Sequence, residues 1–538
     1  MTFGSTLIGT FFSLGDSSAY DWFVTRPIRL KYASAPQIAE PGVIFLEIDG
    51  LAKPIFERAL AEGIMPNLAR WQREQSYVVT GWEPDLSSQT SASQAGLLLG
   101  SNEDIPAFRW YDKQVGGLMV SSKRQTARAI EERIGTGRGL LLGGASRWNV
   151  FTGGATDALC TYSAIGVKGF TPSTRYVAYF ANPYTLPRAI GLYIGDVIRE
   201  RWQAWRQVRA NILPRIHRSR RYAFIRAATT TVMQDTAIFM LLSDMYRGVP
   251  AVYATFFAYD EVAHHSGIDR PDALKTLHKL DAAFATLERA AKTTHRPYHL
   301  VVLSDHGQSM GPTFRQANGH SLGDLVRDLI DSGQAILVDD HPGEAYGRLK
   351  MAMNDIVASE SNTRTEALIR KTIARQIDAS EMESDADLDT PLAELRSMAS
   401  ASDVVVVASG NLGLISFPKV PTRMTFEEIT TAFPRLIPGL LDHPGIGFLM
   451  VRSEDHGCLV IGEAGINYLD HATIEGTDPL ANYGPNAARH LKRTDGFSNA
   501  PDILVMSAWD PAVGTIITTP DRVGYILCDP VAIVCAGA

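Results

Sequence analysis

The chain has 538 residues, of which 45% are hydrophobic and 20% are charged, and its formal net charge is -7. This length fits one large α/β domain with insertions, or two domains. A nucleic-acid-binding chain needs a basic surface and a membrane span needs about 18 apolar residues. We therefore expect no nucleic-acid partner and no transmembrane segment, and a soluble chain that is cytoplasmic by default.

Three apolar segments of the chain each end at an aspartate. Residues 1–41 are predicted to be a linker-like segment, and the first strand follows it. GVIFLEIDG ends with Asp49 and a glycine, AVYATFFAYD ends at Asp260, and HLVVLSDHG carries Asp305. Such runs are typical of buried parallel strands, and ligands bind beyond the carboxyl ends of these strands. We expect the three carboxylates to converge at one edge of a sheet.

Helical patterns alternate with these strands. Residues 53–74 carry Pro54 near a predicted helix start, and residues 274–287 place leucine and phenylalanine at intervals of three and four. This alternation predicts an α/β fold with a doubly wound, mostly parallel central sheet and helices on both faces. Inserted helical and β segments are expected near residues 138–245 and 340–470, the latter including a hairpin that turns at 455–457.

One insertion has an unusual composition. Residues 196–226 contain nine arginines, with Trp202 and Trp205 between them. This pattern suits a membrane-surface or anionic-substrate face, but a solvated pair of helices is the simpler prediction. The acidic residues 378–390 are predicted to be an exposed connector.

The segment SSQTSASQAGLLLG, residues 87–100, offers a nucleophile. It would place Thr90 at the start of a short helix, where backbone N–H groups attract anions and favour an ionised hydroxyl. Ser88, Ser91 and Ser93 compete for this role, and a plain helix N-cap is the structural alternative.

Histidines accompany two of the three aspartates. His264 lies four residues after Asp260, and His306 follows Asp305 directly. Carboxylate oxygens and imidazole nitrogens together suit zinc or manganese. The structural alternative for each aspartate is a helix cap or a turn residue.

These residues, in this order, carry a resemblance to a known family. The series Asp49, Thr90, Asp260-x-x-x-His264 and Asp305-His306-Gly307 resembles the alkaline phosphatase superfamily, in particular its type I phosphodiesterase/nucleotide pyrophosphatase branch. LSSQTSASQAG, DIPAFRW, YDEVAHHSG, SDHGQS and GPNAARHLKRTDGFSNAPDI are similar to the catalytic domain of bacterial proteins that carry it after a holin-like membrane segment. The resemblance covers residues 42–515, which are therefore expected to form the catalytic domain.

The resemblance implies an activity and a set of site residues. It implies two divalent metal ions, zinc above all, with Asp49, Thr90, Asp305 and His306 around the first and with Asp260 and His264 at the second. His265 would not bind this second metal itself but would lie next to its ligands. Thr90 would form a phosphothreonine during hydrolysis of a small-molecule or lipid-linked phosphate ester, and relatives would be membrane-attached.

The chain also departs from the family pattern. The family supplies a further histidine in an HGG-like stretch, whereas this chain has no histidine after His490 and ends in an atypical tail, residues 516–538. We assign this role to none of His456, His471 and His490. The second metal site is therefore expected to be incomplete. The alternative function is that of a catalytically impaired member that acts as a binding or envelope-associated module.

Overall fold

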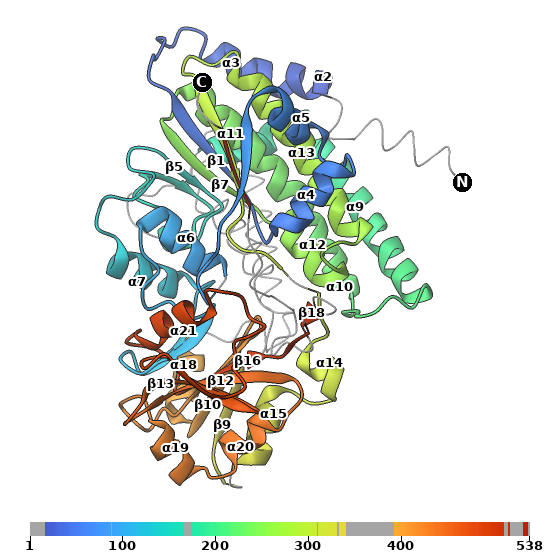
Figure 1. Ribbon diagram of the computed structural model, residues 1–538. Helices are drawn as coiled ribbons and strands as arrows, with labels where there is room; N and C mark the ends of the chain where they lie inside the picture. The colour runs from blue at the N-terminus through green and yellow to red at the C-terminus, as the bar shows by residue number, and fades with distance from the viewer. Residues whose placement is uncertain are drawn as a thin grey trace.

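Two β-sheets organise the computed structural model, one in the upper and one in the lower half of Figure 1. The first has seven strands and the second has eight. The residues that the structure describes are 17–87, 89–165, 174–308, 310–330, 333–339, 392–510, 515–516 and 531–535.

The first sheet carries the predicted strands. Its order is β2 (Tyr77–Gly81), β19 (Val531–Cys535), β8 (Tyr298–Leu303), β1 (Gly42–Ile48), β7 (Ala251–Phe256), β5 (Ala145–Arg147) and β6 (Asp157–Leu159). The five strands from β8 to β6 run parallel, whereas β19 is antiparallel to both of its neighbours. Ile44, Leu46 and Ile48 of β1 are fully buried, as expected for a strand in the middle of a covered parallel sheet.

Helices lie on both sides of this sheet, so the predicted doubly wound, mostly parallel α/β fold is confirmed. In Figure 1, α6 (Thr90–Leu99) and α7 (Arg124–Ile134) lie to the left of the sheet. To the right lie α4 (Lys53–Ala61), α5 (Pro66–Glu74), α12 (Ala258–Ser266) and α13 (Pro271–Ala291). The pattern over 53–74 forms two helices rather than one, because Pro66 starts a new helix and cannot continue the preceding one.

The arginine-rich insertion is helical, as predicted. It belongs to a run of helices between β6 and β7, of which α9 and α10 lie on the right-hand side of Figure 1. The run comprises the 3-10 turn η2 (Tyr162–Ala164), α8 (Thr174–Ala181), α9 (Thr185–Arg209), α10 (Arg220–Ala227), the π-helical turn η3 (Ala228–Met233) and α11 (Gln234–Arg247).

The second sheet is mostly antiparallel. Its order is β15 (Thr473–Gly476), β14 (Gly465–Tyr468), β13 (Gly457–Gly462), β12 (Ile446–Ser453), β16 (Ile503–Ser507), β11 (Leu412–Ser416), β10 (Val404–Ser409) and β9 (Ile336–Asp339). The predicted hairpin is confirmed as β12 and β13. The helices of this region are α14 (Phe314–Asn318), α15 (Leu322–Leu329), α18 (Leu392–Ala401), α19 (Phe426–Ala432), α20 (Leu436–Leu441) and α21 (Ala487–Asp495).

Both faces of the second sheet are buried at β10. Val405 and Val407 of β10 belong to the apolar core of the first sheet, whereas Val404 and Val406 belong to a separate core beneath α15 and α20. This alternation follows from the two-residue period of a strand. The second sheet is therefore packed onto the first sheet's core through one face.

Part of the segment predicted to be a linker is helical. α2 (Ser17–Tyr20), the π-helical turn η1 (Asp21–Thr25) and α3 (Arg26–Lys31) precede β1, and Tyr20 and Val24 are buried in the main core. Two short ribbons complete the described elements, β3 (Arg109–Asp112) with β4 (Gly117–Val120) and β17 (Trp509–Asp510) with β18 (Thr515–Ile516).

Among the described residues, none of the helices combines the length and the apolar content needed to cross a bilayer. The acidic segment 378–390 and Ser88 lie outside the described residues.

Candidate metal and catalytic site

The site begins where β1 ends. Asp49 follows β1 directly and is fully buried, and its backbone N–H donates to the carbonyl of Phe256 at the end of β7, at 3.2 Å. The next residue, Gly50, has φ +72°, and its N–H donates to Asp305 Oδ1 at 3.2 Å. This turn fixes Asp49 at the carboxyl edge of the parallel sheet, as the sequence predicts.

The neighbouring strand β8 supplies the next two side chains. After β8, Ser304 Oγ donates to the carbonyl of His306 at 2.6 Å and accepts from the N–H of Leu51 at 2.9 Å. The N–H of His306 donates to Asp305 Oδ1 at 2.9 Å. These bonds tie the ends of β1 and β8 together and hold Asp305 and His306 beside Asp49.

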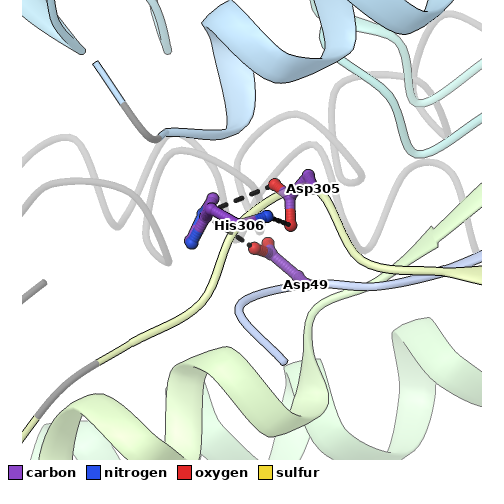
Figure 2. A group of neighbouring side chains, drawn as sticks. All are labelled: Asp49, Asp305 and His306. Atoms are coloured by element: carbon purple, nitrogen blue, oxygen red, sulfur yellow. Dashed lines mark hydrogen bonds and ion pairs between the residues drawn. The ribbon is translucent and has the colours of Figure 1, made fainter. Parts of the chain in front are cut away.

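Asp49, Asp305 and His306 form a compact group of possible metal ligands (Figure 2). Each offers one ligand atom, and these atoms lie within 4.8 Å of one another. All three side chains are buried. In the described part of the chain this is the one group of three or more histidine, cysteine, aspartate or glutamate side chains with such a spacing.

The protonation of His306 follows from its partners. His306 Nδ1 lies 3.1 Å from the carbonyl of Gly307, which can only accept, so Nδ1 carries a proton. His306 Nε2 lies 3.4 Å from Asp49 Oδ1 and 3.4 Å from Asp305 Oδ2. A positive charge among these three atoms, either a proton on the ring or a bound cation, would offset the charge of the two carboxylates. The donor set therefore fits a divalent cation such as zinc or manganese.

Thr90 is the hydroxyl that the structure brings to this group. It is the first residue of α6, and its Oγ1 lies 3.3 Å from His306 Nε2. Gln89, at the N-cap, accepts a hydrogen bond from Ser409 Oγ at 3.0 Å and makes no side-chain cap to the helix. Gln89 thus leaves the backbone N–H groups of the first turn of α6 to other acceptors, such as an anion. Of the competing hydroxyls, Ser91 is fully buried.

A buried network that the sequence analysis missed holds α6 in place. Gln94 Nε2 donates to Glu47 Oε1 at 2.8 Å and to Thr255 Oγ1 at 2.9 Å, and Gln94 Oε1 accepts from the N–H of Val150 at 2.8 Å. Burial and the nearby Asp305 carboxylate raise the pKa of Glu47 to about 8. The available signal was Glu47 itself, the single charged residue within the apolar run of β1.

Asp260 does not end a strand, so that part of the prediction is wrong. β7 ends at Phe256 and Asp260 lies in the first turn of α12, where an acidic side chain is stabilised by the helix dipole. The spacing of four residues places His264 one turn along the same face, with its Nε2 3.1 Å from Asp260 Oδ2.

This second pair adjoins the first group through Gly50. Gln308 Nε2 donates to the Asp260 carboxylate and, at 3.3 Å, to the Asp260 carbonyl. A β-carbon at Gly50 would collide with the same carboxylate and with Gln308 Nε2. A cavity of about 30 Å³ lies beside His264, lined also by Gln308, Met310 and Pro214. The structure thus brings all six predicted site residues to the carboxyl edge of the first sheet.

The other histidines lie in different environments. His265 Nδ1 lies 3.1 Å from the carbonyl of Glu261, its ring stacks on Tyr222 at 3.8 Å, and burial lowers its pKa to about 3. His490, on α21, lies 3.2 Å from both Asp85 and Glu83. His456 packs against the rings of Tyr468 and His471. Among the described residues, Asp260 and His264 belong to no group of three possible metal ligands.

All six site residues lie within a segment that matches a known protein family. The family model for type I phosphodiesterase/nucleotide pyrophosphatase matches residues 43–411. Phosphonoacetate hydrolase from Sinorhizobium meliloti 1021, in complex with phosphonoacetate, is 11% identical, with coverage of 93% of this chain and 90% of that chain and a TM-score of 0.40. Wild-type alkaline phosphatase PafA is 9% identical, with coverage of 92% and 91% and a TM-score of 0.40. No curated protein matches the chain.

A parallel α/β sheet with carboxylates, imidazole and a helix-borne hydroxyl at its carboxyl edge is an arrangement that suits a hydrolase of phosphate esters. The family match is specific within that class. The chain belongs to the type I phosphodiesterase/nucleotide pyrophosphatase family, and the predicted resemblance is confirmed.

Proposed function

We propose that the chain is a metal-dependent phosphodiesterase or pyrophosphatase in which Thr90 is the nucleophile. The convergence of Asp49, Asp305 and Thr90 on His306 Nε2 supports this proposal most directly. Asp49, Asp305, His306 and Thr90 would hold one divalent cation, and Asp260 with His264 would hold part of a second. Bound there, such a cation would lower the pKa of the Thr90 hydroxyl and offset charge on the phosphoryl oxygens.

Other groups of the chain would contribute to the reaction. The backbone N–H groups at the start of α6 would donate hydrogen bonds to the non-bridging phosphoryl oxygens next to Thr90. Thr90 Oγ would lose its proton and form a bond to phosphorus as the bond to the leaving alkoxide breaks, which gives a phosphothreonine ester, and the alkoxide would take up a proton to leave as the alcohol. Water would then attack phosphorus in line, which returns the Thr90 hydroxyl and releases the monoester.

Hydrolysis of bis-p-nitrophenyl phosphate with added zinc or manganese tests the proposal. Thr90→Ala should lower kcat by about a thousandfold or more, because it removes the attacking atom, whereas Thr90→Ser should retain turnover. Ser91→Ala is the matched control, since it removes the adjacent hydroxyl from the same helix turn. A quenched reaction should also show an aryl phosphoryl group on Thr90 by peptide mass.

The results separate this proposal from the impaired-member alternative. Turnover that needs metal and disappears only in Thr90→Ala supports the enzyme. Equal losses in Thr90→Ala and Ser91→Ala would contradict the assigned nucleophile. A lack of turnover with every metal would favour a binding or envelope-associated module.

A further inference from the structure

The longest helix of the arginine-rich insertion has its apolar side turned outward. Six apolar side chains of α9 are each between 50% and 64% exposed: Ile190, Ile194, Ile198, Trp202, Trp205 and Val208. They recur at intervals of four and three, so they follow one face of the helix. We call this face the α9 stripe. At 1.5 Å per residue it is about 27 Å long.

The inner side of the same helix is polar. Asp196 accepts from Lys279 Nζ at 2.8 Å, Glu200 accepts from Arg218 Nε at 2.6 Å, and Gln207 donates to the carbonyl of Ser266 at 3.2 Å. These three α9 side chains are buried. A surface helix in water normally buries its apolar face and exposes its polar face. In α9 this arrangement is reversed, which is expected where the outer face meets an apolar phase.

The exposed charged side chains of α9 and α10 have one sign. Arg201, Arg206 and Arg209 on α9 and Arg220 and Arg221 on α10 are exposed. Between residues 185 and 226 the chain has two acidic side chains, and both are turned inward and paired. The whole chain carries a formal charge of -7, so this positive patch is a local feature.

The exposed tryptophans combine apolar area with this charge. The guanidinium of Arg206 lies 4.7 Å from the ring centroid of Trp202, and that of Arg209 lies 5.2 Å from that of Trp205. Tryptophan with arginine suits the boundary between lipid headgroups and acyl chains.

The N-terminal helices extend the same kind of surface. Phe23 stacks on Tyr184, the residue before α9, at 4.8 Å. Trp22 and Leu30 are exposed, and the guanidinium of Arg26 lies 4.0 Å from the Trp22 ring.

We propose that the α9 stripe docks this protein onto an anionic lipid bilayer, with α9 lying in the plane of the membrane. The polar inner face of α9 remains against the protein, and the exposed arginines pair with lipid phosphates. A second copy of the chain is a poorer occupant, because it would bring an identical set of positive charges to the contact. The chain between α9 and α10 also supplies Pro214 and Ile216 to the cavity beside His264, so the segment that follows α9 adjoins the site described above.

Vesicle flotation at low salt tests the proposal with the full chain. The protein should float with vesicles of phosphatidylcholine mixed with phosphatidylglycerol and less with phosphatidylcholine alone, and added salt should weaken binding. Trp202→Glu/Trp205→Glu should reduce binding about tenfold or more. Leu142→Glu, at another site that is 64% exposed, should bind like the wild type. Brominated lipids should quench the fluorescence of the wild type more than that of the double variant.

Other outcomes would overturn the proposal. Absence of flotation with anionic vesicles would do so, as would equal flotation of the wild type and a double variant with native circular dichroism. If the wild type did not bind vesicles but formed dimers that the double variant does not form, the occupant of the α9 stripe would be a second copy of the chain.

Discussion

Gly50 links the two halves of the site at the level of a single residue. We predict that Gly50→Ala lowers kcat/KM about tenfold or more, because the new β-carbon would displace the Asp260 carboxylate and Gln308. The backbone strain of alanine at positive φ costs about 1 kcal/mol or slightly more and is separate from this collision.

Gly63→Ala is the matched control for this effect. Gly63 has φ +71°, almost the same as Gly50, but a β-carbon there would meet open space. It should lower the thermal midpoint through the backbone strain alone and leave kcat/KM unchanged. If both variants lost activity equally, strain rather than the position of Asp260 would be the cause.

Glu47 gives the metal-free protein a predicted pH dependence. Its pKa is about 8 in the fold, against an ordinary value of 4.5, because of burial and the nearby Asp305 carboxylate. Between these values the unfolded chain has released a proton that the folded chain keeps, so the contribution of Glu47 to stability should fall as pH rises from about 5 to about 8. His265, whose pKa is lowered to about 3, opposes this fall up to its ordinary value of 6.5, so the net fall should be steepest between about pH 6.5 and pH 8. Glu47→Gln should flatten this slope in urea unfolding of EDTA-treated protein.

Asp324→Asn provides the comparison for the Glu47 experiment. Hydrogen bonds from the backbone and side chain of Ser321 lower the pKa of Asp324 to about 2. Its stabilising contribution is complete above about pH 4, so its loss should shift the curve without changing the slope between pH 5 and pH 8. A slope that survives in Glu47→Gln would assign the pH dependence to another group.

The site residues differ in how far the sequence could reveal them. Asp49 and Asp305 follow apolar strands, and the topology of a parallel sheet brings such positions together. Gln94 and Gln308 could not be predicted, because their partners lie 47 and 48 residues away and are fixed only by tertiary packing. Asp260 was predicted at the carboxyl edge of the sheet, where it lies, but at the end of a strand instead of in the first turn of α12.

At the scale of elements, α6 depends on Gln94 for its position. Gln94→Leu should cost about 2–3 kcal/mol of unfolding free energy, because it removes hydrogen bonds from the buried groups of Glu47, Thr255 and Val150. It should also lower kcat, since Thr90 begins the same helix and would shift with it.

Gln75→Leu separates stability from catalysis. Gln75 Nε2 donates to Glu288 Oε1 at 2.6 Å next to α5, away from Thr90. This variant should lose stability and keep kcat. A normal kcat in Gln94→Leu would show that the network does not position the nucleophile.

The periodic patterns predicted elements better than their boundaries. The alternation of strand and helix was enough for the α/β class, and the hairpin of β12 and β13 was correct. The pattern over 53–74 did not reveal that one helix ends and a second begins at Pro66. The local sequence also did not predict that residues 531–535 form a strand between β2 and β8. Pairing of that kind depends on a partner strand that is distant in the sequence.

At the scale of the whole molecule, the two sheets share an apolar layer. Val405 and Val407 extend from the second sheet into the first core, and Phe448 and Met450 of β12 do the same. The sequence could show that these strands are apolar but not which face packs against which core. Because neither sheet can lose this layer without exposing the other, we expect the protein to unfold as one cooperative unit.

Because the protein is expected to unfold as one unit, metal binding should increase the free energy of unfolding of the whole chain. A cation bound by Asp49, Asp305 and His306 ties β1 to β8, so zinc or manganese at about 100 times its Kd should add about 2.7 kcal/mol. For a chain of 538 residues this corresponds to a rise in Tm of about 2–3 °C, and EDTA should reverse it.

Asp305→Asn should abolish the rise, whereas Asp260→Asn should preserve most of it, because the described residues give the second pair no third ligand. Metal analysis should accordingly find closer to one tightly bound equivalent per chain than two. Two equivalents of equal affinity, or equal losses in both variants, would mean that the second site is complete.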